Sequence, residues 1–170
     1  MSCALTQGYT LSCKESIGGI KAVWFIPFGD VSAITQASGI VSAITKGGGK
    51  VFYKYELVKN TGTVTETVTA SVENGTVFYA QELTMILNKL QANTRNEILL
   101  LAKNNLIAVF QDSNNKYWLV GKINGMDITG GTAATGTAQG DRSGYELTFS
   151  GGEPELAPEV ASSIIAGLTA

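Results

Sequence analysis

The stretch Thr94–Lys122 constrains the fold most, because it predicts one helix followed directly by a β-hairpin. Thr94 and Glu97 have the spacing of a capping box, in which each side chain hydrogen-bonds the other residue's backbone amide at a helix start. Apolar residues at helical spacing follow, and the runs Leu106–Phe110 and Tyr117–Val120 then predict two strands joined by a two-residue turn. The remaining strands need such a unit to pack against. The core residues that we expect are Ile98, Leu101, Val109, Trp118 and Leu147.

Other apolar and alternating runs predict that the rest of the chain is mainly β-structure. With 170 residues, 44% of them hydrophobic, the chain fits a single domain over residues 1–170. Only 15% of residues are charged, which suits a small neutral β-domain and equally a subunit covered by copies of itself. The expected fold class is α+β, mainly β with one packed helix. Further strands are predicted at Ile20–Phe28, twice within Val31–Ile44, and at Val51–Val58, Thr76–Leu90 and Tyr145–Phe149.

Residues 60–74 form an unusual threonine-rich segment. Its threonines alternate with Val64, Glu66, Val68 and Ala70, so the segment has high β-propensity but scarcely any bulky apolar side chain. It can extend but cannot bury much core of its own. We therefore expect either a flexible excursion or an arm that pairs with another chain.

Two later segments are expected to lie outside the regular core. Residues 124–144 are rich in Gly, Thr and Ala, which predicts a loop with one or two poorly anchored strand fragments. Residues 151–170 are expected to form an extended C-terminal tail, because Gly151-Gly152 ends the preceding strand and two prolines follow without periodicity. The tail carries three glutamates and no basic residue, which indicates a solvated segment, and Ser162–Leu168 forms a short helix or is frayed.

The sequence contains no constellation of residues that would perform chemistry. It has no histidine, which excludes Ser-His-Asp and Cys-His sites and removes the commonest metal ligand. The acidic residues each suit a local structural role, and the glycines of Lys46–Lys50 lack the spacing of a phosphate-binding loop. We therefore expect no enzyme activity, no catalytic residue, no cofactor, no metal and no small-molecule substrate.

Charge and hydropathy bound the possible partners and compartment. The net charge of −2 gives no basic field for nucleic acid, and no apolar run is long enough to cross a membrane. The first residues lack the pattern of a signal peptide, so a cytoplasm-like compartment is expected. In such a compartment Cys3 and Cys13 are expected to be free thiols rather than a disulfide.

Several motifs together resemble a known class of proteins. NGTVFYAQELTMILNKLQ, TRNEILLLAKNNLIAVFQDSNNKYWLVGK and GDRSGYELTF follow the order of long strand, helix, YWLxG strand and GYxLTF strand, and the opening ALTQGYTLSCKESIGGIK fits too. This order resembles virion structural proteins of tailed bacteriophages that infect Bacteroidetes. Within that class the element order is most similar to tail tube proteins, and the resemblance covers most of the chain.

The resemblance implies a fold and a function. It implies an antiparallel β-sandwich or barrel with an extended β-rich arm, forming hexameric rings that stack around a DNA channel. The protein would be assembled in the host bacterial cytoplasm and would lie in the virion. Its partners would be copies of itself and other virion proteins, and DNA could lie nearby in the channel without specific contacts. The alternatives are a capsid decoration or neck protein, and an unrelated ligand-binding β-domain or enzyme. The expected inter-subunit contacts are Thr63, Val64, Thr65, Val68, Thr69, Thr132 and Thr135.

Overall fold

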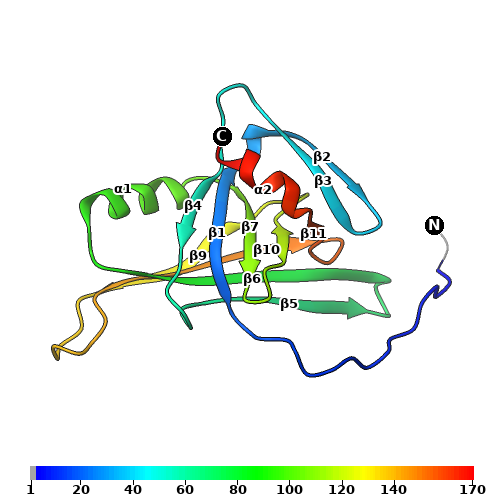
Figure 1. Ribbon diagram of the computed structural model, residues 1–170, viewed down its shortest axis with the longest axis horizontal. Helices are drawn as coiled ribbons and strands as arrows, with labels where there is room; N and C mark the ends of the chain where they lie inside the picture. The colour runs from blue at the N-terminus through cyan, green and yellow to red at the C-terminus, as the bar shows by residue number, and fades with distance from the viewer. Residues whose placement is uncertain (1–2) are drawn as a thin grey trace.

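The computed structural model describes residues 3–170 and is mainly β, with two sheets and two helices (Figure 1). The first sheet has seven strands in the order β2-β3-β11-β8-β7-β1-β4, and we call it the large sheet. The second has four strands in the order β5-β6-β10-β9, and we call it the small sheet. Figure 1 shows the strands of the small sheet running across those of the large sheet.

The large sheet is built around two strands that are apolar on both faces. β1 pairs antiparallel with β7, and Phe25 lies opposite Ala108. Because neighbouring side chains of a strand point to opposite faces, Val23 and Phe25 face one cluster while Trp24 and Ile26 face another. The strands of this sheet are β1 (Ile20–Pro27), β2 (Val31–Ala37), β3 (Ile40–Lys46), β4 (Tyr53–Glu56), β7 (Leu106–Asp112), β8 (Tyr117–Val120) and β11 (Glu159–Val160).

The small sheet is entirely antiparallel and is centred on one long strand. β6 pairs with β5 on one side and with β10 on the other, so that Leu83 lies between Val64 and Phe149. β9 pairs only with β10 and forms one edge, and β5 forms the other. The strands of this sheet are β5 (Gly62–Ser71), β6 (Thr76–Asn88), β9 (Asp127–Ala134) and β10 (Gly144–Glu153).

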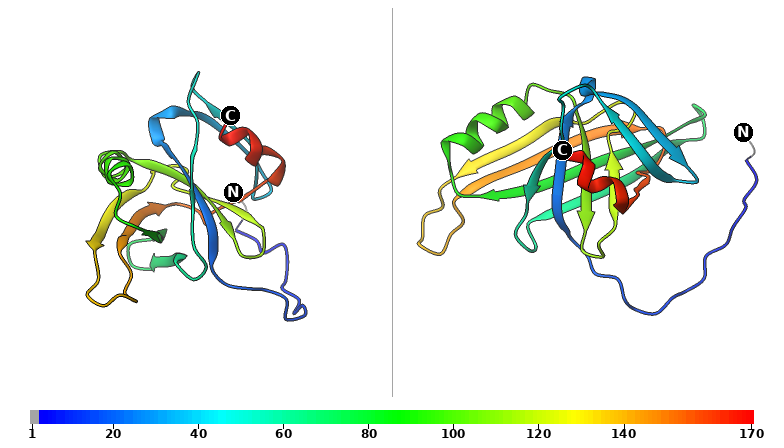
Figure 2. Two further views of the ribbon diagram at one scale, coloured as in Figure 1. Left: turned by 60° about the vertical axis from the view of Figure 1, so that its left-hand side comes forward. Right: turned by 45° about the horizontal axis from the view of Figure 1, so that its top comes forward.

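The main hydrophobic core lies between the two sheets. Phe25 of the large sheet and Phe149 of the small sheet are both fully buried, and their ring centroids lie 4.8 Å apart. The opposite face of the large sheet packs a second cluster, which includes Trp24 and Leu168. Helix α2 (Ser162–Leu168) and the β2–β3 hairpin lie over that face, and a short 3-10 turn at Phe28–Asp30 leads into the hairpin (Figure 2). Both faces of the large sheet are therefore covered within one chain.

The predicted helix exists, but its predicted start is wrong. Helix α1 spans Ala92–Leu101 and begins after Gln91, which makes no side-chain cap, so Thr94 lies inside the helix and cannot form a capping box with Glu97. Lys89 turns the chain sharply at the end of β6 with a φ of 71°, which starts the helix earlier than the capping residues suggest. The following β7–β8 hairpin is present, but the predicted two-residue turn is wrong: residues 113–116 connect the strands, and the Asp112 amide donates a hydrogen bond to the Lys116 carbonyl across this loop.

The prediction of an extended C-terminal tail over residues 151–170 is wrong. β10 continues to Glu153, and β11 pairs with both β3 and β8. Of the two alternatives for Ser162–Leu168, the short helix is confirmed as α2, which gives the described chain a second helix. The glutamates are held rather than solvated. The Glu153 side chain is 2% exposed and accepts hydrogen bonds from the amides of Ile123 and Asn124, and Glu159 pairs with Lys116 at 2.7 Å.

The two segments predicted to lie outside the core are also more ordered than expected. Residues 60–74 are not a free arm, because β5 pairs along its whole length with β6 of the same chain. Within residues 124–144, β9 forms an eight-residue edge strand, and only the stretch after Ala134 is a loop. Neither segment has enough apolar residues to reveal its partner, because the bulky side chains come from β6 and β10.

Candidate functional site

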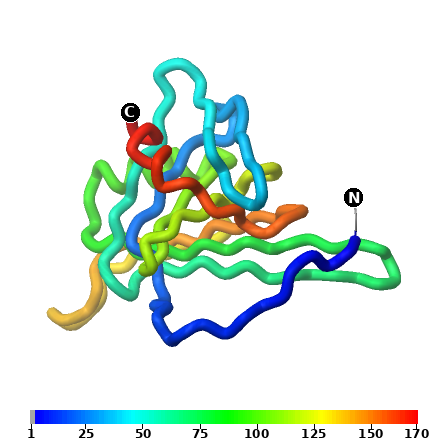
Figure 3. Tube along the Cα trace, turned by 45° about the vertical axis from the view of Figure 1, so that its right-hand side comes forward, coloured from blue at the N-terminus to red at the C-terminus, as the bar shows by residue number. Residues whose placement is uncertain are grey.

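The turn end of the β5–β6 hairpin extends beyond the core of the molecule. β10 ends at Glu153, which lies opposite Tyr79, so residues 76–78 of β6 have β5 as their only neighbouring strand. Figures 1 and 3 show this end of the hairpin projecting beyond the rest of the molecule. A two-stranded hairpin without a covered face is marginally stable in water, so its projecting end needs support from another surface.

One face of the projecting hairpin carries apolar side chains on both sides of a polar pair. Val64 and Val68 of β5 and Tyr79 and Val77 of β6 share this face with buried Leu83, and Glu66 and Gln81 lie between them. Val64 packs against the main core, whereas Val68 and Val77 are 57% and 53% exposed. We call this the inner face of the hairpin. The Gln81 side chain donates a hydrogen bond to the Glu66 carboxylate at 3.0 Å, and this polar pair separates the exposed apolar stripe of Val68 and Val77 from the main core.

The opposite face of the hairpin is lined by threonines on β5, but it also carries Phe78 of β6, which lies opposite Thr69 and is 45% exposed. Thr63, Thr65 and Thr69 lie there with Thr84, whose hydroxyl is 3.4 Å from that of Thr148 on β10. The predicted contact residues on β5 therefore divide between two faces. Val64 is largely core, Val68 belongs to the exposed apolar stripe, and the threonines form the outer face.

The two remaining predicted contact residues lie at the far edge of the small sheet. Thr132 is exposed on β9, opposite Glu146, and Thr135 lies in the following loop, where its hydroxyl donates to the Gly136 carbonyl. β6 and β10 separate this edge from β5. The structure thus places the predicted contacts at opposite edges of one sheet rather than in one patch.

A third surface was missed by the sequence analysis. The segment before β1, residues 3–19, contains no helix or strand, and its large apolar side chains Leu5, Tyr9, Leu11 and Ile17 are all exposed. We call this segment the lead. The signal was present in the sequence, because Leu5, Tyr9 and Leu11 alternate with small or polar residues in the period of a half-buried strand.

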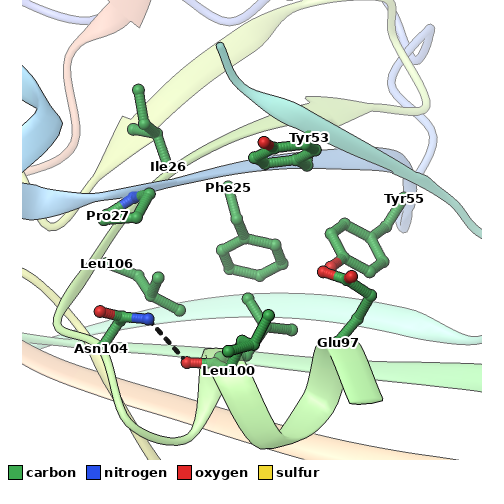
Figure 4. A pocket seen from close by; sticks show the side chains of 10 residues that line it. Phe25, Ile26, Pro27, Tyr53, Tyr55, Glu97, Leu100, Asn104 and Leu106 are labelled. Carbon is green, nitrogen blue, oxygen red and sulfur yellow. Dashed lines mark hydrogen bonds between the residues drawn. The ribbon is translucent and has the colours of Figure 1, made fainter. Parts of the chain in front are cut away.

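A small pocket lies between α1 and the end of the large sheet (Figure 4). Its volume is about 230 Å³, below the roughly 300–1,000 Å³ of typical ligand sites. Tyr53, Tyr55 and Glu97 line it, and Figure 4 shows the Tyr55 hydroxyl beside the Glu97 carboxylate. Burial raises the pKa of Tyr55 to about 12, and the charge of Glu97 and the neighbouring Tyr53 add to this effect.

We expect Tyr55 to make the protein less stable at alkaline pH. The unfolded chain releases the phenolic proton near pH 10, whereas the folded chain retains it until about pH 12. The stability contributed by neutral Tyr55 is therefore complete below pH 10 and is lost as the pH rises towards 12. Urea unfolding between pH 9 and 11.5 should show a steeper loss for the wild type than for Tyr55→Phe, which keeps the ring contact with Phe25. Parallel curves would contradict the assignment.

No grouping of side chains in the described part of the chain indicates catalysis. Residues 3–170 contain no group of three His, Cys, Asp or Glu side chains that could hold a metal ion. Acidic residues serve local structure: the amides of Ala138 and Thr137 donate to Asp141 and hold the pKa of its carboxyl below the usual range.

The described chain exposes strand edges and apolar surfaces, which are features that often mark contacts between proteins. Among residues 3–170, no helix is long and apolar enough to cross a membrane. The chain matches no protein-family model, no curated protein and no solved structure.

Proposed function

We propose that this chain is a non-enzymatic structural subunit of a tailed-bacteriophage virion, which assembles with copies of itself into rings of the tail tube around the DNA channel. The observation that carries the proposal is the projecting β5–β6 hairpin, whose inner face exposes Val68 and Val77. Exposed apolar side chains that gather on one face of a chain with so few charges are typical of a subunit interface.

The architecture supports the same proposal. The two sheets share one core, and this arrangement is compatible with the β-sandwich expected for a tail tube subunit. Both sheets remain open, so β5 and β9 each have one edge without a neighbouring strand in residues 3–170. Open edges favour addition of strands from another chain. A ring of subunits would cover such edges without requiring a different partner.

The proposal predicts that the purified chain assembles without another virion protein. Light scattering after size-exclusion chromatography, with negative-stain microscopy of the same fractions, should show rings or tubes with a central hole as concentration rises. Burial of about 800 Å² on each partner is typical of a stable interface, and assembly in the micromolar range is expected. A chain that stays monomeric at every concentration would contradict self-assembly. Binding of that monomer to purified phage capsids would instead favour a decoration or neck protein.

A further inference from the structure

The lead has the pattern of a β-strand whose partner is missing. Leu5, Tyr9 and Leu11 fall on one side of an extended chain, together with Gln7 and Cys13. These three apolar side chains are 99%, 88% and 86% exposed. Within the described chain, residues 5–13 make no hydrogen bond to any other element. An alternating segment with a fully exposed apolar side is expected to find a surface outside its own subunit.

The point at which the lead leaves the molecule is fixed. The Asn114 side chain accepts a hydrogen bond from the Ile17 amide at 2.9 Å and donates to the Ile17 carbonyl at 3.0 Å. β1 follows at Ile20, whose side chain packs against Gly62 at the start of β5. The lead therefore starts beside the β5 edge of the small sheet and runs outside the body of the molecule (Figures 1 and 3).

The opposite edge of the small sheet carries an apolar groove of about 330 Å³. Tyr145 and Leu147 of β10, Ile98 of α1 and Ala133 of β9 line the groove. Gly131 lies opposite Leu147, whose side chain comes within 3.1 Å of the position that a Cβ on Gly131 would take. Because Gly131 has no side chain of its own, a large side chain of a strand added at this edge can contact Leu147 directly.

The two features lie at opposite edges of one sheet, separated by β6 and β10. The lead leaves beside β5, so the groove beside β9 suits the lead of a neighbouring subunit. We propose that residues 5–13 of one copy add as a strand to the free edge of β9 in a second copy, with Tyr9 over Gly131. This inference rests on the proposed function, because it supplies the head-to-tail contact that a ring requires.

The direction of the added strand decides which acidic residue lies near Lys14. In an antiparallel register with Tyr9 opposite Gly131, Lys14 falls next to Asp127 at the start of β9. Neither Lys14 nor Asp127 forms an ion pair within residues 3–170. A parallel strand in the same position would carry Lys14 to Gly136, which packs against Asp141. All strand pairs of the small sheet are antiparallel, and we expect the added strand to follow them.

The first test measures binding of the lead as a peptide. A fluorescent peptide of residues 3–15, kept reduced, is titrated with full-length protein whose own lead carries Leu5→Ser, Tyr9→Ser and Leu11→Ser. We expect saturable binding with one peptide per chain. Ala133→Asp places a carboxylate in the groove and should weaken binding about tenfold or more, whereas Ala134→Asp, exposed on the opposite face, should change it less than about twofold.

A charge exchange tests the register. A peptide with Lys14→Glu should bind less tightly than the natural peptide, and Asp127→Lys in the protein should restore the loss. Absence of peptide binding, or equal weakening by Ala133→Asp and Ala134→Asp, would overturn the inference. Failure of Asp127→Lys to restore binding of the Lys14→Glu peptide would overturn the antiparallel register.

A mixing experiment separates the lead from ring formation. The triple serine variant keeps the groove and loses the lead, and Ala133→Asp keeps the lead and loses the groove. A mixture should form one-to-one pairs by light scattering, while each variant alone does not pair through this contact. Such pairs would support the inference even if the wild type formed no ring. Wild-type rings without these pairs would leave the proposed function standing and overturn the role of the lead.

Discussion

Replacing Phe149 with alanine is expected to lower the free energy of unfolding by about 3–5 kcal/mol. Phe149 is fully buried on β10, lies opposite Leu83 and packs against Phe25 of the large sheet. It therefore joins the two sheets at the centre of the main core. The substitution would remove this contact and leave a cavity that the paired strands on both sides cannot easily close. Urea unfolding followed by tryptophan fluorescence, at concentrations below assembly, measures the loss.

The neighbouring residue provides a matched control. Thr148 lies on the same strand but on the outer face, where its hydroxyl makes a weak contact of 3.4 Å with Thr84. Thr148→Ala should change the free energy of unfolding by only about 0.5 kcal/mol. If Phe149→Ala cost no more than this control, the sheets would not be held together by the cluster between them.

Local patterns predict the parts of the fold whose partners are near in sequence. The helix and the β7–β8 hairpin follow from helical spacing and from two apolar runs close together. Leu101, Val109 and Leu147 are buried, and Ile98 and Trp118 pack against the main core while remaining partly exposed. These core positions could be predicted from the sequence, because bulky apolar side chains at regular spacing indicate which face of a helix or strand is buried.

The pairing of distant segments is not contained in such patterns. β11 is only two residues long and is held by β3 and β8, which lie more than a hundred and about forty residues earlier in the chain. Glu153 looks like a solvated acid in sequence, because the amides of Ile123 and Asn124 that bind it carry no sequence signal. A segment with glutamates and prolines therefore reads as a tail although tertiary contacts order it.

The edge strands of the small sheet show a second reason why strand pairing is hard to predict from the sequence. β5 has threonines on one face and few large apolar residues on the other, so its own residues do not identify its partner. The turn at Asn74-Gly75 directly before β6 is a hairpin signal that outweighs the lack of bulk. The contact residues on β5 could be assigned to faces by alternation, but which face remains exposed depends on where β10 ends.

Assembly is expected to fail when the inner face of the projecting hairpin is charged. Val68 and Val77 lie on neighbouring strands, on the same face, and both are more than half exposed in the subunit. The double substitution Val68→Asp and Val77→Asp removes two apolar contacts and would bury two carboxylates in the interface. The concentration required for assembly should rise about a hundredfold or more. Sedimentation velocity across a concentration series measures the change.

The outer face provides the control, with the same number of charges on the same hairpin. Thr67→Asp with Thr69→Asp adds two carboxylates to the outer face, where Phe78 lies opposite Thr69, and should leave assembly within about threefold of the wild type. Both double variants should unfold at similar urea concentrations, because all four side chains are exposed in the subunit. The reverse result, with assembly lost only in the threonine variant, would place the contact on the outer face. Unchanged assembly in both would remove the hairpin from the interface and leave the edge of β9 as the remaining contact.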